Sequence, residues 1–140
     1  MIFDTHAHYD DRKFNKDRDE LMKQLRAAGI ERIVDIGADI ESTRRAVDLA
    51  KQYDFIYAAA GVHPSDVDCL DERSFQWLTC LVEESVEEKG KIVAVGEIGL
   101  DYYWEKAPER RKQQKYWFEQ QMELARKTGL PVVIHSREAA

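Results

Sequence analysis

Five short apolar runs alternate with four longer segments of helical periodicity along the 140-residue chain. Near-continuous apolar runs separated by helices are typical of parallel strands that are buried on both faces of a sheet. This alternation predicts an α/β fold, either a (β/α) barrel or an open doubly wound sheet. The expected strands are 2–6, 32–36, 55–61, 92–97 and 131–135.

The expected helices carry start and stop signals at both ends. Capping residues precede the first three segments, namely Asn15 or Asp17, then Asp39, then Asp71. The fourth segment has Pro108 in its first turn, and a glycine follows three of the four. These positions agree with the helical period of the apolar residues between them, so we expect four helices joined to the strands by short connections.

Polar residues at the strand ends favour the barrel over the open sheet. They are His6 with His8, His63, Glu97 and His135, and they follow four different apolar runs. A barrel gathers its functional residues at the carboxyl ends of several strands, whereas an open sheet concentrates them at one switch point. The chain has neither a G-x-G-x-x-G motif nor a P-loop, so nothing favours a dinucleotide or P-loop site.

The number of strands is smaller than a closed barrel needs. Each βα unit takes about 32 residues, so eight units need roughly 260 residues. We therefore expect the first five strands and four helices of a (β/α)8 barrel, with residues 1–140 as the N-terminal part of a single barrel and about 120 residues to follow. The alternative is a complete chain that pairs its open sheet edges with another chain, or by self-association.

Composition narrows the class of partner. The formal net charge of −6 argues against binding nucleic acid through a broad basic surface, although metal ions can supply positive charge that a residue count misses. The sequence shows no membrane-spanning run and no signal peptide. Cys69 and Cys80 are expected to be reduced packing residues without a disulfide. We expect a cytoplasmic protein, or a nuclear one in a eukaryote.

His6 and His8 point most directly to metal chemistry. Residues two apart in a strand face the same way, and two neutral imidazoles at that separation can share one divalent ion. Asp4 lies on the same face and is expected to orient one imidazole. The alternative is a pair of polar residues at a strand end with no metal.

Glu97 and His135 also follow apolar runs. A carboxylate after such a run is costly unless it is paired or bound to a metal, so a ligand role is favoured over a solvated loop residue. Gly96 and Gly99 beside it are expected to let the backbone approach a ligand. For His135 the alternative to a site residue is a histidine satisfied within the core.

Two further features each allow two interpretations. His63 precedes Pro64, and it either contacts a substrate phosphate and transfers a proton, or fixes the turn through its ring nitrogens. The basic and aromatic stretch 110–117 either stacks on single-stranded bases or forms a solvated helix face with an apolar underside.

Four motifs together resemble the TatD family of metal-dependent deoxyribonucleases. They are D-T-H-A-H at 4–8, G-V-H-P at 61–64, G-E-I-G-L-D-Y-Y at 96–103 and L-P-V-V-I-H-S-R at 130–137. The resemblance implies a TIM barrel of the amidohydrolase type with two divalent ions, Mg, Mn or Zn. It implies that His6 and His8 bind one ion and His135 the other. Glu97 would bridge the two ions and serve as the catalytic residue.

The resemblance also assigns roles around this site. It implies substrate-binding or supporting roles for His63, Asp101 and Arg137. The family takes a further histidine and an aspartate from later strands, which 140 residues do not reach. Glu138 stands where the family often has aspartate, and the longer carboxylate is expected to shift only a supporting contact.

The implied activity is hydrolysis of DNA phosphodiesters, preferably in single strands from the 3′ end. An ester or amide hydrolase, such as an aminoacyl-tRNA deacylase, needs the same activated water and is the alternative. A third hypothesis is a truncated, non-catalytic form that needs a partner or self-association to fold, which leaves the activity of the 140 residues themselves open.

Overall fold

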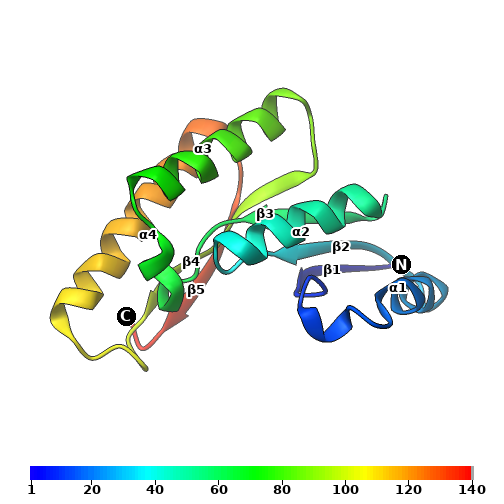
Figure 1. Cartoon of the computed structure of the whole chain (residues 1–140), viewed down its shortest axis with the longest axis horizontal. Helices are drawn as coiled ribbons and strands as arrows, with labels where there is room; N and C mark the ends of the chain where they lie inside the picture. Colours follow the sequence, from blue (N-terminus) through cyan, green and yellow to red (C-terminus); the bar gives the residue numbers. More distant parts are fainter. Residues whose placement is uncertain (140) are drawn as a thin grey trace.

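The computed structural model describes residues 1–139, which form one parallel sheet with helices between its strands. The strands are β1 (Ile2–Ala7), β2 (Ile30–Ile36), β3 (Ile56–Ala60), β4 (Ile92–Asp101) and β5 (Val132–Arg137). They lie side by side in chain order, and every neighbouring pair is parallel. Four α-helices connect them, together with two 3-10 turns. These are η1 (Arg12–Phe14), α1 (Arg18–Ala27), α2 (Ile40–Gln52), η2 (Pro64–Cys69), α3 (Glu72–Glu87) and α4 (Pro108–Thr128). The result is an open half of a (β/α)8 barrel (Figure 1).

The helices begin where the capping residues and Pro108 predict. The side chains of Asp39 and Asp71 each accept a hydrogen bond from the backbone N–H of the serine three positions on, at 2.6 and 2.7 Å. In return, each serine hydroxyl accepts one from the backbone N–H of its aspartate. These capping boxes satisfy N–H groups that the first helical turn leaves free. α4 starts at Pro108 and is followed by Gly129 in the left-handed conformation, with φ of 70°.

β4 is longer than expected, because it continues for four residues beyond Glu97. Its pairing with β5 extends from Ile98 opposite Ile134 to Asp101 opposite Arg137. Glu97 therefore lies inside a strand rather than at its end. Asp101, which the apolar pattern placed after the strand, is its last residue.

The glycines of β4 allow a close approach between β4 and β5. Their expected role in letting the backbone approach a ligand stays a prediction. A Cβ on Gly96 would lie 2.6 Å from Cβ of Val133, and one on Gly99 would lie 1.8 Å from the backbone oxygen of His135. Gly99 also has φ of +148°, which side chains rarely adopt. Both glycines thus bring β5 and its histidine close to β4.

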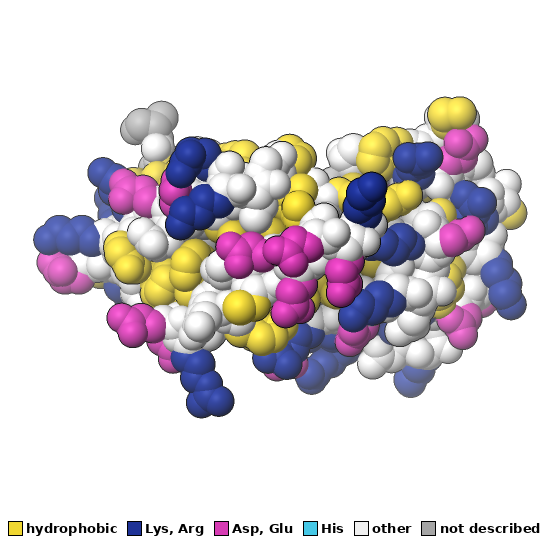
Figure 2. Space-filling model, turned by 90° about the horizontal axis from the view of Figure 1, so that it is seen from above, with side chains coloured by type: hydrophobic (Ala, Val, Ile, Leu, Met, Phe, Trp, Pro, Cys, Tyr) yellow, Lys and Arg dark blue, Asp and Glu magenta, His cyan; other side chains and the backbone are white. Residues whose placement is uncertain are grey.

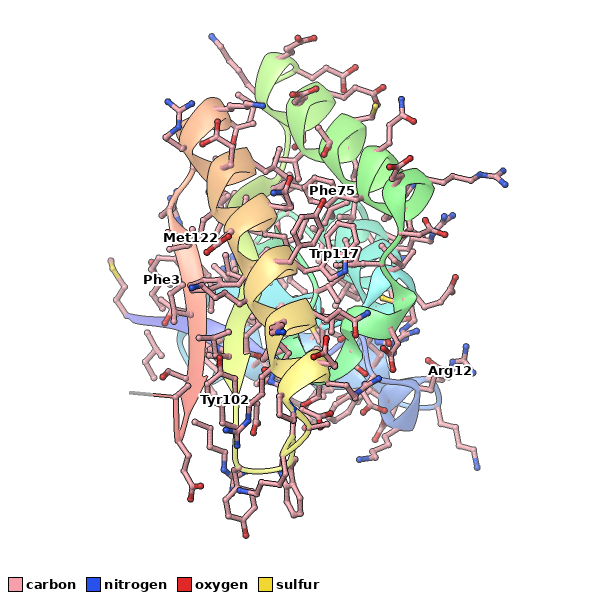
Figure 3. The ribbon with its side chains drawn as sticks, turned by 90° about the vertical axis from the view of Figure 1, so that its left-hand side faces the viewer. Phe3, Arg12, Phe75, Tyr102, Trp117 and Met122 are labelled. Carbon is pink, nitrogen blue, oxygen red and sulfur yellow. The ribbon has the colours of Figure 1, made fainter. Side chains whose placement is uncertain are left out.

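The two faces of the sheet have different cores. The outer face packs against the helices, and its cluster includes Met22 of α1, Leu49 of α2, Leu78 of α3 and Leu124 of α4. A smaller cluster consists only of strand residues and lies on the inner side, which would be the inside of a closed barrel: Val34, Ile36, Ala59 and Ala94. Figure 3 shows Phe75 and Trp117 facing one another between α3 and α4, with ring centroids 5.5 Å apart.

Two expectations about burial are wrong. β1 and β5 are the edges of the described sheet and are not buried on both faces: Phe3 is 56% and Ile134 48% exposed. The thiols of Cys69 and Cys80 are free and both residues are exposed, so the predicted packing role is wrong. Within residues 1–139, no helix has the length and apolar character to cross a membrane.

Candidate metal centre

Histidines converge on Glu97, which lies within β4. His6 and His135 belong to β1 and β5, and His8 and His63 lie in the segments that follow β1 and β3. Two groups of potential ligands result, one of His6, His8 and Glu97 and the other of His63, Glu97 and His135. In each group, one ligand atom from every residue lies within 4.8 Å of the others. The structure thus brings together the four predicted metal ligands and adds His63. Their roles as ligands stay predictions.

His8 has its ring orientation and proton position fixed by β2. Its Nδ1 lies 3.0 Å from the backbone oxygen of Ile36. Because a carbonyl oxygen can only accept, Nδ1 carries the proton and Nε2 keeps a free lone pair for an ion. His6 faces Glu97, with 3.5 Å between Nε2 and Oε2. The carboxylate of Asp4 accepts from the backbone N–H of His6 at 3.2 Å, so it shapes the strand end rather than orienting an imidazole.

His135 is held in the opposite tautomer by Asp101. Its Nε2 lies 3.0 Å from Oδ2 of Asp101, and its Nδ1 faces Oε1 of Glu97 at 3.3 Å. Burial raises the pKa of Asp101, but hydrogen bonds from the backbone N–H of Trp104 and from His135 outweigh it and hold the pKa below its usual value. Asp101 is therefore an anion that accepts from Nε2–H and leaves the Nδ1 lone pair free.

Asp101 is fixed in turn by α4. Its backbone N–H donates to Oε1 of Gln114 at 2.9 Å, and Nε2 of Gln114 donates to the Asp101 carbonyl at 3.2 Å. Gln114 is buried, and Gln121, two turns further along α4, makes the same paired contact with the backbone of Val62. Two glutamines on one face of a helix thus anchor the ends of β3 and β4.

Asp101→Asn is expected to weaken metal binding by about 10- to 100-fold in the full-length protein. The asparagine amide can donate to Nε2 of His135, which would move the imidazole proton to Nδ1, where it faces Glu97. Calorimetric titration with Mn²⁺ or Zn²⁺ measures the effect. Asp68→Asn, which changes an exposed carboxylate paired with Arg110, is the control. Equal affinities of the Asp101 variant and the parent would contradict this role.

His63 differs from the other histidines of the site. Its Nδ1 accepts a hydrogen bond from the backbone N–H of Ser65 at 3.0 Å. Burial and repulsion from His135 lower the pKa of His63, so the ring is neutral near pH 7 and its proton lies on Nε2. A donor of this kind suits an anionic oxygen better than a metal ion. The contact with Ser65 also shows that His63 fixes its turn.

The sequence analysis missed a buried carboxylate behind His8. Asp35 is fully buried in β2 and accepts hydrogen bonds from the backbone N–H groups of Tyr9 and Asp10, at 2.6 and 3.3 Å. Asp10 is itself paired with Arg45 of α2 at 3.1 Å. These bonds fix the turn that follows His8. An aspartate inside the apolar run 33–36 was the available signal, because an unpaired buried carboxylate is costly.

The basic stretch on α4 is a solvated helix face. Arg110 is held by Asp68 and Glu105 at 2.7 and 2.6 Å, and Trp117 is buried against Phe75. This supports the interpretation of an apolar underside. Arg137, at the end of β5, instead places its guanidinium 4.0 Å from the ring centroid of Tyr103.

A half-barrel whose strand ends present histidines around a shared glutamate defines the class of (β/α)8 metal-dependent hydrolases. The sequence comparison narrows this class. The profile of the TatD related DNase family matches residues 3–140, and the chain belongs to that family.

Individual relatives agree with this assignment. The chain is 42% identical to the uncharacterized metal-dependent hydrolase YabD of Bacillus subtilis, over 99% of this chain and 52% of that protein. It is 32% identical to the 3′-5′ ssDNA/RNA exonuclease TatD of Cronobacter sakazakii, over 99% and 50%. The crystal structure of YjjV, a TatD homologue from Escherichia coli, superimposes with a TM-score of 0.81 at 31% identity, over 98% and 51%. The chain spans about half the length of the relatives it matches.

Proposed function

We propose that the full-length protein is a divalent-metal-dependent phosphodiesterase that shortens single-stranded DNA from its 3′ end. The observation that carries this proposal is the position of Glu97 between two groups of histidine donors. The name of the Cronobacter relative supports the substrate class and the polarity. Figure 2 shows acidic and basic side chains interspersed on the face in view, with no broad basic patch there.

The donor set fits two ions. His6 and His8 would hold one ion and His135 the other, and Glu97 would contribute to both. Imidazole and carboxylate together suit zinc or manganese, and a phosphodiester substrate accommodates magnesium. When bound, such ions activate water and stabilise charge on phosphoryl oxygens. The resemblance to the family implies two more ligands from later strands.

The chain's own residues position the substrate and hold protons. Nε2–H of His63 would donate to a phosphoryl oxygen. Because the pKa of His63 is lowered, its ring donates as a neutral imidazole rather than as a cation. Asp101 keeps the proton of His135 on Nε2. The Ile36 carbonyl accepts from His8 and keeps the proton of that ring on Nδ1. The imidazoles of His8, His63 and His135 therefore have their protons placed before substrate arrives.

Metal removal tests the proposal. We expect a chelator to abolish cleavage of an oligothymidylate by the full-length protein, and Mg²⁺, Mn²⁺ or Zn²⁺ to restore it. A 5′-labelled strand should shorten stepwise, as expected for removal from the 3′ end. Cleavage that persists in excess chelator would overturn the metal dependence.

The same assay tests the alternative substrate, an aminoacyl ester. Hydrolysis of an aminoacyl-tRNA is measured beside that of the oligonucleotide under identical conditions. Faster turnover of the aminoacyl ester would replace the nuclease proposal with an ester hydrolase, because the same residues serve both reactions.

A further inference from the structure

An exposed aromatic pair lies in the turn between β4 and α4, beside the candidate metal centre. Trp104 is 70% exposed and Tyr103 39%, and their rings meet edge to face with centroids 4.6 Å apart. The turn extends beyond Tyr102 at one end of the molecule (Figure 3). A large indole exposed to this degree costs hydrophobic free energy unless something covers it.

Cationic groups surround the pair. The guanidinium of Arg137 lies 4.0 Å from the ring centroid of Tyr103 and 5.6 Å from that of Trp104. Nζ of Lys106 lies 5.8 Å from the Tyr103 ring, donates to the Tyr102 carbonyl and is paired at 3.8 Å with the exposed Glu138. In the part of the chain that the structure describes, Arg137 forms no ion pair with a carboxylate. Its charge is therefore available to an anion.

The turn is held by the same carboxylate that orients the metal-site histidine. Oδ1 of Asp101 accepts from the backbone N–H groups of Tyr103 and Trp104, at 3.1 and 3.3 Å, while its Oδ2 accepts from His135. Tyr102 donates its N–H to the Arg137 carbonyl at 2.9 Å. Arg137 and His135 are two apart on β5 and therefore share a face. The aromatic pair thus has a fixed position relative to the site.

We propose that Trp104 stacks on a nucleobase of a single-stranded substrate, while Arg137 binds an adjacent phosphate. This inference rests on the proposed function, and it names the residues that select the substrate. Every base offers a π-face to an indole, and a guanidinium pairs with a phosphate. The bases of a duplex are stacked on each other, so their faces are not available. A strand seated this way would account for the proposed preference for single strands in a protein with net charge −6.

Binding measured without turnover tests this proposal. Fluorescence anisotropy of a labelled oligothymidylate is recorded in the Glu97→Gln background of the full-length protein, with and without Trp104→Ala. We expect Trp104→Ala to raise the Kd about 5- to 100-fold. Trp104→Phe, which keeps a smaller ring, should recover most of the loss. Tyr116→Ala removes a ring that is 53% exposed on α4 and should change the Kd less than twofold.

A strand made of abasic residues separates stacking from other contacts. The penalty of Trp104→Ala should shrink at least fivefold on this strand. An unchanged Kd for the oligothymidylate, or an equal loss on the abasic strand, would overturn the proposal. If Trp104 instead packs against other parts of the protein, both Trp104 variants lower the melting temperature and Trp104→Phe recovers no binding, which also overturns it.

Failure of this proposal and failure of the proposed function give different results. A wild-type protein that cleaves no oligonucleotide, but whose binding depends on Trp104 and on the bases, loses the nuclease assignment and keeps the stacking site. A wild-type protein that cleaves the strand while Trp104→Ala binds it normally keeps the nuclease assignment and loses the stacking site.

Discussion

Glu97→Gln is expected to lower the metal-dependent turnover of the full-length protein by about two to three orders of magnitude. Glu97 is the one residue shared by the two groups of donors, and its two carboxylate oxygens face His6 and His135, at 3.5 and 3.3 Å. Glutamine keeps the size of the side chain but loses its charge and one of its acceptor oxygens. Charge stabilisation by bound ions is worth several kcal/mol, and each 1.4 kcal/mol is about a factor of ten in rate.

A matched substitution separates this effect from a general loss of charge. Glu83 is exposed on α3, and Glu83→Gln should leave kcat/KM and metal content unchanged. Steady-state kinetics, metal analysis and the melting temperature are compared for the three proteins. Retention of wild-type turnover by a folded Glu97→Gln protein would remove Glu97 from the catalytic site.

Most of the fold could be predicted from local signals. Helix starts at Asp39, Asp71 and Pro108 depend on residues next to one another in the sequence, and the structure confirms them. The five strands could also be predicted, because each coincides with an apolar run of residues that are neighbours in the sequence. The end of β4 could not be predicted in this way, because residues 98–101 are held by pairing with β5, which is about 35 residues away in the sequence.

The residues that meet at the candidate site could be predicted from the sequence, but the proton positions on their imidazoles could not. A parallel sheet runs its strands in one direction, so residues toward their carboxyl ends lie close together, which is why His6, His8, Glu97 and His135 meet. The proton positions on the imidazoles depend on contacts across the fold, such as His8 with the Ile36 carbonyl, and no local pattern contains them. The exposure of Cys69 and Cys80 likewise depends on which side of a helix or turn faces the solvent.

Asp35→Asn is expected to flatten the pH dependence of stability between pH 4 and 7. Burial, followed by repulsion from Asp10, raises the pKa of Asp35 to about 7, from 3.8 for an ordinary aspartate. Between these values the folded protein holds a proton that the unfolded chain has released, so the free energy of unfolding falls as the pH rises. The contribution is complete below pH 3.8 and is lost above about pH 7.

The size of this effect follows from the shift. One proton is worth about 1.4 kcal/mol per pH unit, so the contribution of Asp35 changes by at most roughly 4 kcal/mol over this window. Asp10 has its pKa raised and Asp101 has its pKa lowered, so the total profile mixes several groups. The difference between the parent and Asp35→Asn isolates the single carboxyl.

Urea unfolding of the full-length protein at a series of pH values, in the presence of a chelator, measures this difference. The stability advantage of the parent over Asp35→Asn should shrink steadily from pH 4 to 7 and then stay constant. Asp48→Asn, on the exposed side of α2, should give a profile parallel to that of the parent. A parallel profile for Asp35→Asn as well would mean that Asp35 titrates normally, and that its bonds to Tyr9 and Asp10 offset its burial. The turn after His8 would then be fixed by an ionised carboxylate at every pH at which the protein works.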